Sequence, residues 1–158
     1  IGGNTGLRGS YRLSDDLTLN GSVAAHSILT DPTLAPLSVY VPFRGSVDGS
    51  VSLRFENERV TNETGLSGTV GSLYDRDTRW HAWNTSRVNA GNGVSIDASL
   101  SGGEYVSGEA FVHANAGVTY RPTDRLSLSL SGGASTSMMN GGVADVIPQG
   151  SFSLSYDF

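Results

Sequence analysis

Apolar and polar residues alternate with a period of two along most of this chain. The alternation is most regular near the C-terminal end, where leucines and serines take turns in 125–131. In 151–158 the aromatic residues and the leucine share one side, and the serines and the aspartate share the other. Successive side chains of a β-strand point to opposite faces of a sheet. The pattern therefore predicts strands with one apolar face and one polar face.

The same alternation recurs upstream and predicts nine strands, of which 65–72 and 79–90 are the least regular. The nine predicted strands are 6–13, 17–26, 45–56, 65–72, 79–90, 93–101, 109–121, 125–131 and 151–158. Short polar turns are predicted at 13–16, 56–62, 89–92 and 121–125, and longer loops at 29–43, 73–78, 102–108 and 139–149. Short turns on one rim and long loops on the other are typical of bacterial outer-membrane barrels. We therefore expect an all-β fold, an antiparallel up-and-down transmembrane β-barrel with about 8–10 strands in this chain.

Residues 1–158 are expected to form a single outer-membrane barrel domain. Single-chain bacterial barrels usually have an even number of strands. Because the predicted count is odd, we expect further chain before Ile1 and a larger barrel of which this chain is a part. A miscount of the strands within 57–104 and a barrel built from several chains are the alternatives.

Composition agrees with a barrel and excludes other classes of protein. Hydrophobic residues make up 37%, charged residues 16%, and the mean hydropathy is −0.15. A barrel with lipid on one face and water on the other averages to such a value, whereas disorder usually needs a high net charge. The chain has no Cys, which excludes disulfides and thiolate chemistry. Its net charge of −5, with no basic run, gives no electrostatic support for nucleic-acid binding.

The polar side of the predicted strands would line a hydrated interior. Its charges would tune what passes through an open pore, or would pair with one another and fill a narrow barrel. The residues predicted to line the pore are Arg8, Arg12, Asn20, Ser22, Asp48, Ser50, Arg54, Asp97, Ser99, His113, Asn115, Arg121, Ser127, Ser129, Ser153 and Ser155.

Two histidine–carboxylate groupings near the long loops are the only candidates for catalysis. Asp75 and Asp77 are close in sequence to His81, and His26 is close to Asp31. A histidine beside a carboxylate can act as a general base. Solvated loop residues explain the same spacing, and no serine is uniquely placed as a nucleophile. We therefore expect no enzyme activity, no cofactor and no metal.

The end of the chain resembles a known class of proteins. The terminal strand SFSLSYDF resembles the C-terminal signature of bacterial outer-membrane proteins, and 117–133 (GVTYRPTDRLSLSLSGG) resembles the penultimate hairpin of autotransporter translocator barrels. The resemblance covers about the last 50 residues. The family barrel is larger and has a helix in its pore, and this chain shows neither the helix nor enough strands. The resemblance implies a membrane-insertion signal, recognised by the barrel-assembly machinery, at Phe152, Leu154, Tyr156 and Phe158.

Together these features predict a barrel in the bacterial outer membrane that forms a polar passage for export, secretion or passive transport. The expected partners are outer-membrane lipid, the barrel-assembly machinery, and a passenger or other secretion-system chains. One alternative is a small surface barrel that acts as an adhesin or recognition protein through its outer loops. The other is a soluble secreted β-rich adhesin domain.

Overall fold

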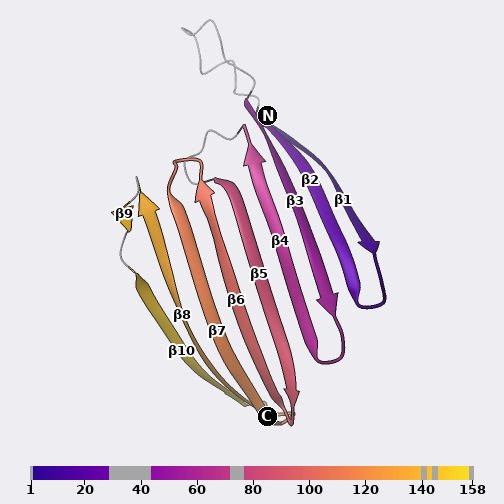
Figure 1. The fold of residues 1–158 in the computed structure, drawn as a ribbon, viewed down its shortest axis with the longest axis vertical. Coiled ribbons are helices and arrows are strands. Elements are labelled where there is room, and N and C mark those ends of the chain that lie inside the picture. The colour runs from indigo at the N-terminus through magenta and orange to yellow at the C-terminus, as the bar shows by residue number, and fades with distance from the viewer. Residues whose placement is uncertain (1, 29–43, 72–76, 140–141, 144–145, 157–158) are drawn as a thin grey trace, which may run out of the picture.

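The chain forms one antiparallel sheet of long strands connected in sequence (Figure 1). This computed structural model describes residues 2–28, 44–71, 77–139, 142–143 and 146–156. Its strands are β1 (Gly2–Arg12), β2 (Leu17–Ile28), β3 (Arg44–Glu56), β4 (Val60–Val70), β5 (Thr78–Gly91), β6 (Val94–Tyr105), β7 (Ala110–Thr123), β8 (Leu126–Met139), the short β9 (Gly142–Val143) and β10 (Ile147–Tyr156). Within the described ranges no helix is long and apolar enough to cross a membrane.

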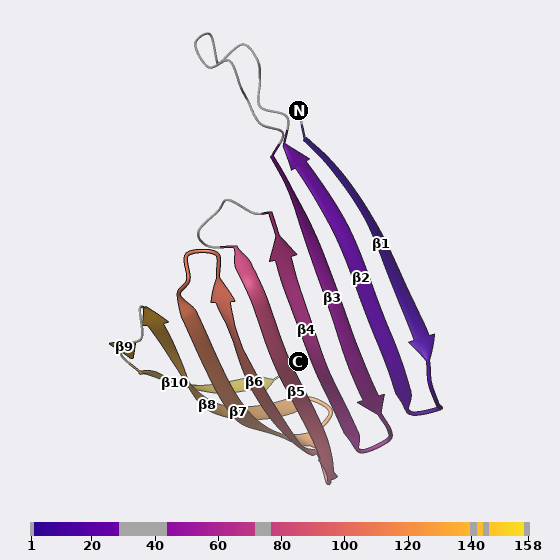
Figure 2. The same ribbon diagram turned by 45° about the horizontal axis from the view of Figure 1, so that its top comes forward.

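The strand order is β1-β2-β3-β4-β5-β6-β7-β8-β10, with β9 attached to β8 alone. The prediction of a nine-strand antiparallel meander is confirmed, including the two irregular strands, which are β4 and β5. The sheet is not closed, because in the part of the chain that the structure describes β1 pairs only with β2, and β10 only with β8. The expected closed barrel is therefore not formed by these strands. Figure 2 shows the sheet curving, with β8 and β10 turned away from the plane of β2–β4.

Local sequence explains the short turns. The side chain of Asn57 accepts the backbone N–H groups of Arg59 and Val60 at 2.9 and 2.8 Å, which closes the β3–β4 turn. Asn92 and Gly93 have φ of 52° and 75°, as a two-residue hairpin turn with an Asn-Gly sequence requires. The connection between β6 and β7 is shorter than predicted. Strand β6 continues to Tyr105, so only residues 106–109 remain outside the strands.

The two faces of the sheet differ as the alternation predicts. Paired residues lie on the same face, and the registers bring the apolar positions of neighbouring strands together, as in Leu19 opposite Leu53. Tyr11, Phe55, Tyr120 and Tyr156 all lie on this apolar face, close to the rim formed by the short turns.

No conventional core holds the sheet together. Four of the described residues are buried: Phe111 and Ser52, each 8% exposed, and the glycines Gly65 and Gly103. The registers place all four on the polar face. Large apolar side chains on the other face are exposed, up to 79% for Leu7. Within the described ranges the buried positions therefore lie on the polar face, and the large side chains of the apolar face are exposed.

Candidate functional site

The polar face brings together almost all the residues predicted to line a pore. The strand registers place Arg8 beside Ser22 and Ser50, and Ser99 beside Asn115. Arg121 lies where the pairing of β7 with β8 is irregular, so the register does not assign its face. The predicted residues that share the polar face are Arg8, Arg12, Asn20, Ser22, Asp48, Ser50, Arg54, Asp97, Ser99, His113, Asn115, Ser127, Ser129, Ser153 and Ser155.

Hydroxyl groups on the polar face bond to one another across neighbouring strands. Each pair joins directly opposed residues, the geometry in which cross-strand side chains interact most strongly. The pairs are Ser22–Ser50 at 2.7 Å, Thr119–Ser129 at 3.2 Å and Ser131–Ser151 at 2.7 Å.

Charged residues gather on the half of the polar face nearest the short turns. Arg54 pairs with Glu56 at 2.8 Å, and Arg87 pairs with Asp97 on the adjacent strand. Both pairs line a hollow of about 540 Å³ that also includes Glu63. Each partner is more than a third exposed, so the pairs contribute little to stability and their charges remain accessible to a solute.

His26 has a carboxylate partner that sequence proximity did not indicate. Its Nε2 lies 2.6 Å from Oδ2 of Asp48, on the neighbouring strand, and its Nδ1 lies 3.0 Å from Oδ1 of Asn4. The hydroxyl of Thr69 donates to the other oxygen of Asp48 at 2.6 Å. Asp31, the partner expected from sequence, lies outside the described residues. The hydroxyl bonds to the carboxylate rather than to the imidazole, so this network links β1 to β4 and does not form a nucleophile–base pair.

The second proposed histidine group is described only in part. Asp75 lies outside the described residues, and His81 stacks on Trp83 with ring centroids 5.4 Å apart. Asp77 accepts a hydrogen bond at its backbone oxygen from Val106 at 2.8 Å. Among the described residues no three His, Asp or Glu side chains are grouped so that they could hold a metal ion.

An aromatic cluster on the polar face was missed by the sequence reasoning. Phe111 lies at its centre, with ring centroids 4.7 Å from Tyr105, 5.8 Å from His81 and 5.3 Å from His113. Period-two alternation alone places these residues with the serines, which is the signal that could have found them. The cluster explains why this part of the polar face is the most enclosed.

Two glycines make room for these aromatic rings. A Cβ on Gly65 would lie 2.2 Å from Cζ2 of Trp83. One on Gly103 would meet the backbone oxygen of Trp80 first, and would also lie 2.9 Å from Cζ of Phe111. Trp83 is directly opposite Gly65, and Phe111 is directly opposite Gly103. Each ring therefore covers the backbone of the neighbouring strand, and we call these two positions the glycine notches.

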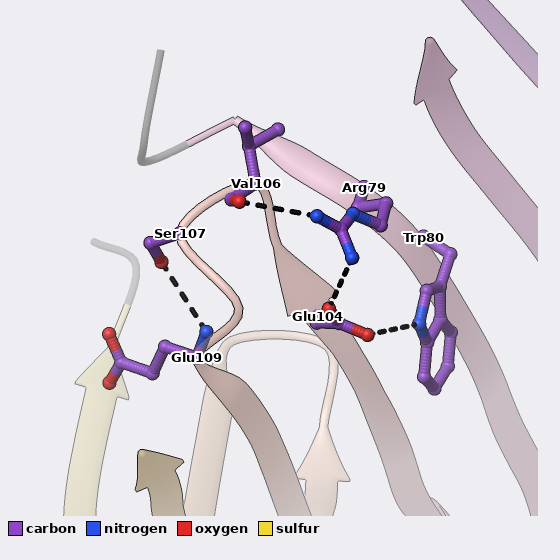
Figure 3. A network of polar contacts seen from close by, with 6 residues as sticks. All are labelled: Arg79, Trp80, Glu104, Val106, Ser107 and Glu109. Carbon is purple, nitrogen blue, oxygen red and sulfur yellow. Dashed lines mark hydrogen bonds and ion pairs between the residues drawn. The ribbon is translucent and has the colours of Figure 1, made fainter. Parts of the chain in front are cut away.

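The rim opposite the short turns is braced by a carboxylate (Figure 3). Glu104 accepts the guanidinium of Arg79 at 2.7 Å and the indole N–H of Trp80 at 3.2 Å. Arg79 also reaches the carbonyl oxygen of Val106 at 3.4 Å. The backbone pairing of β5 with β6 is irregular between Thr78 and Trp80. These side-chain contacts connect the two strands where that pairing is interrupted.

Four uncharged polar residues lie together on the apolar face, and we call them the amide patch: Asn62, Thr64, Asn84 and Ser86. The registers place Asn62 opposite Phe55 and Thr64 opposite Leu53, so the patch is on the apolar face. Asn62 donates to Ser86 at 2.7 Å and Asn84 donates to Thr64 at 2.6 Å. The other bonds within the patch are 3.3–3.5 Å long.

The expected membrane-insertion signal lies largely on one exposed strip. Phe152, Leu154 and Tyr156 share the apolar face of β10 and are 52–70% exposed. Phe158 lies outside the described residues. No family model, curated protein or solved structure matches the chain, so the resemblance to outer-membrane barrels rests on its own residues alone.

Proposed function

We propose that this chain forms part of the wall of a bacterial outer-membrane barrel that provides a polar passage for export, secretion or passive transport. The observation that carries the proposal is the apolar face, whose large side chains are exposed along the sheet, while the few buried residues lie on the opposite, polar face. Soluble proteins rarely expose a contiguous apolar patch of more than a few hundred Å². Hydrocarbon is the medium in which such a face is stable.

The polar face supports passage of a polar solute. Its hydroxyl pairs and accessible ion pairs present donors, acceptors and both signs of charge along the height of the wall. Rings of such side chains determine which solutes enter a membrane channel. The network around His26 and Asp48 adds to this surface without the geometry of a catalytic site.

Strand direction supports a barrel larger than these nine strands. Successive strands are antiparallel, so β1 and β10, the first and ninth in the order, run in the same direction. Direct pairing of these two edges would therefore be parallel. An exposed strand edge is not stable in hydrocarbon, because each unpaired backbone group costs several kcal/mol there. An odd number of further strands, from this polypeptide or from another chain, would close the barrel with antiparallel pairs throughout.

In this proposal β10 is the strand that the barrel-assembly machinery recognises, through the exposed Phe152, Leu154 and Tyr156. Replacing all three with serine would abolish assembly in the outer membrane. Replacing the opposite serines, Ser153 and Ser155, with alanine would leave assembly intact. Equal assembly of the two variants, measured by fractionation of the outer membrane, would remove this role.

Extraction and conductance test the proposed function. The folded protein should need detergent, should migrate differently on a gel before and after boiling, and should give discrete conductance steps in planar bilayers. A protein that stays monomeric in buffer without detergent would instead be a soluble β-rich protein, and the proposal would be wrong. If the protein were embedded in the membrane but gave no conductance, the barrel part of the proposal would stand and the open passage would be wrong.

A further inference from the structure

We propose that the amide patch is the contact through which two copies of this chain associate side by side in the membrane. This inference rests on the proposed function, because it takes the apolar face to be the one that meets lipid. Asn84 is the seventh of the 14 residues of β5, and Thr64 the fifth of the 11 residues of β4. The patch therefore lies near the middle of the strands rather than at a rim, where headgroups and water would solvate it.

The hydrogen bonds within the patch leave two amide oxygens poorly satisfied. Oδ1 of Asn84 accepts only bonds of 3.3 and 3.4 Å, and Oδ1 of Asn62 only bonds of 3.5 Å. Good N–H···O and O–H···O bonds are about 2.7–3.0 Å long. In hydrocarbon no water completes these acceptors, and leaving a polar group unmatched there costs free energy. A second polar surface would supply the missing donors.

The chemistry of the patch identifies a second copy of the same chain as that surface. The four side chains carry both donors and acceptors and no charge, so the patch is complementary to itself when rotated by a twofold axis. Such an axis along the barrel axis keeps both copies in the same membrane orientation. A patch of fixed charge would instead require a partner of opposite charge.

The surroundings of the patch fit a small interface with a polar centre. Exposed apolar side chains of the neighbouring strands surround it, so that contact would exclude lipid from the amides on all sides. These residues are Leu53, Phe55, Leu66 and Leu100, which are 37–56% exposed. Hydrogen bonds between side chains in such a setting favour association inside a membrane.

The first test measures the oligomeric state of the full chain in detergent by sedimentation. We expect a dimer whose dissociation constant rises about tenfold or more in the variant Asn62→Leu/Asn84→Leu, as loss of interchain hydrogen bonds should produce. The matched control is Asn20→Leu/Asn115→Leu, which removes two amides from the polar face and should leave the dimer unchanged. A monomeric parent protein, or a dimer equally stable in both variants, would overturn the proposal.

A cross-linking test holds even where the leucine variant fails to fold. The chain has no cysteine, so Ser86→Cys introduces a single thiol in the patch. In membranes, oxidation should join two copies through this position, whereas Leu130→Cys, far along the apolar face, should not cross-link. Cross-linking of Ser86→Cys only to a different protein would refute the second copy as partner. Embedding in the membrane without dimers would overturn this inference alone, whereas a soluble monomer would overturn the proposed function as well.

Discussion

Replacing Gly65 with alanine tests whether the glycine notches hold the aromatic cluster in place. The new Cβ would lie 2.2, 2.5 and 2.6 Å from three atoms of the Trp83 indole. Carbon atoms that are not bonded do not approach within 3.0 Å, and the indole is rigid. The ring must therefore move off the backbone of β4, which also separates it from His81.

The magnitude follows from three contributions. Overpacking of this kind costs about 1–3 kcal/mol. Loss of the stacked pair with His81 costs about 0.5–1.5 kcal/mol. Alanine is better than glycine inside a strand by about 0.5–1 kcal/mol, which partly offsets these terms. We expect the free energy of unfolding to fall by about 1–3 kcal/mol.

Denaturant titration followed by circular dichroism measures this change without relying on the fluorescence of Trp83. The matched control is Gly21→Ala, also in a central strand, where the new Cβ would meet only Ser50 O at 3.7 Å and should be neutral or stabilising. In the Trp83→Ala background the clash disappears, so Gly65→Ala should no longer destabilise. The explanation would be refuted if both glycine variants behaved alike, or if Gly65→Ala cost the same with and without the indole.

Three further predictions concern the two faces and the rim. Leu100→Arg, at a side chain 56% exposed on the apolar face, should destabilise the membrane-embedded protein by about 2–4 kcal/mol. Ser99→Arg, on the polar face, should cost much less. Equal losses of unfolding free energy in a denaturant titration would contradict the assignment of faces. Glu104→Gln should weaken the contacts to Arg79 and Trp80 and speed trypsin cleavage at this rim. Glu109→Gln alters a carboxylate outside that network and should not change the rate. Identical digestion rates for the two variants would show that Glu104 does not brace the rim. Arg87→Glu should shift the reversal potential of the bilayer conductance toward cation selectivity, and an unchanged potential would place this residue outside the passage.

The sequence predicted the strands wherever one face is formed by apolar residues and the other by polar residues without exception. In β8 leucine and serine alternate without exception over 126–131, and in β10 serine alternates with Phe152, Leu154 and Tyr156. The strands, their faces and the short turn between β7 and β8 therefore follow from period two. The grouping on one face of the residues predicted to line a pore follows from the same period. Closure did not follow, because alternation within the strands does not determine which strands pair at the two edges, and the described parts of β1 and β10 do not pair with each other.

Strands β4 and β5 were less regular in sequence for a physical reason that only the registers reveal. Asn62 and Asn84 occupy positions on the apolar face, and Trp83 occupies one on the polar face. These residues reduce the contrast between alternate positions, so the alternation is weaker in β4 and β5. The partner of His26 could not be predicted because its pairing depends on the register of β2 against β3.

The residues of β4 and β5 that break the alternation have one explanation if both faces are considered together. Trp83 on the polar face and Asn84 on the apolar face are successive residues, as are Gly65 and Thr64 on the neighbouring strand. The amide patch is therefore backed directly by a glycine notch filled by an indole ring. A contact between two barrels can discriminate its partner only if its groups are held in fixed positions, because ordering them on association would cost conformational entropy. In the proposed dimer, the ring of Trp83 would supply that rigidity from the opposite face of the sheet, directly behind the amide patch.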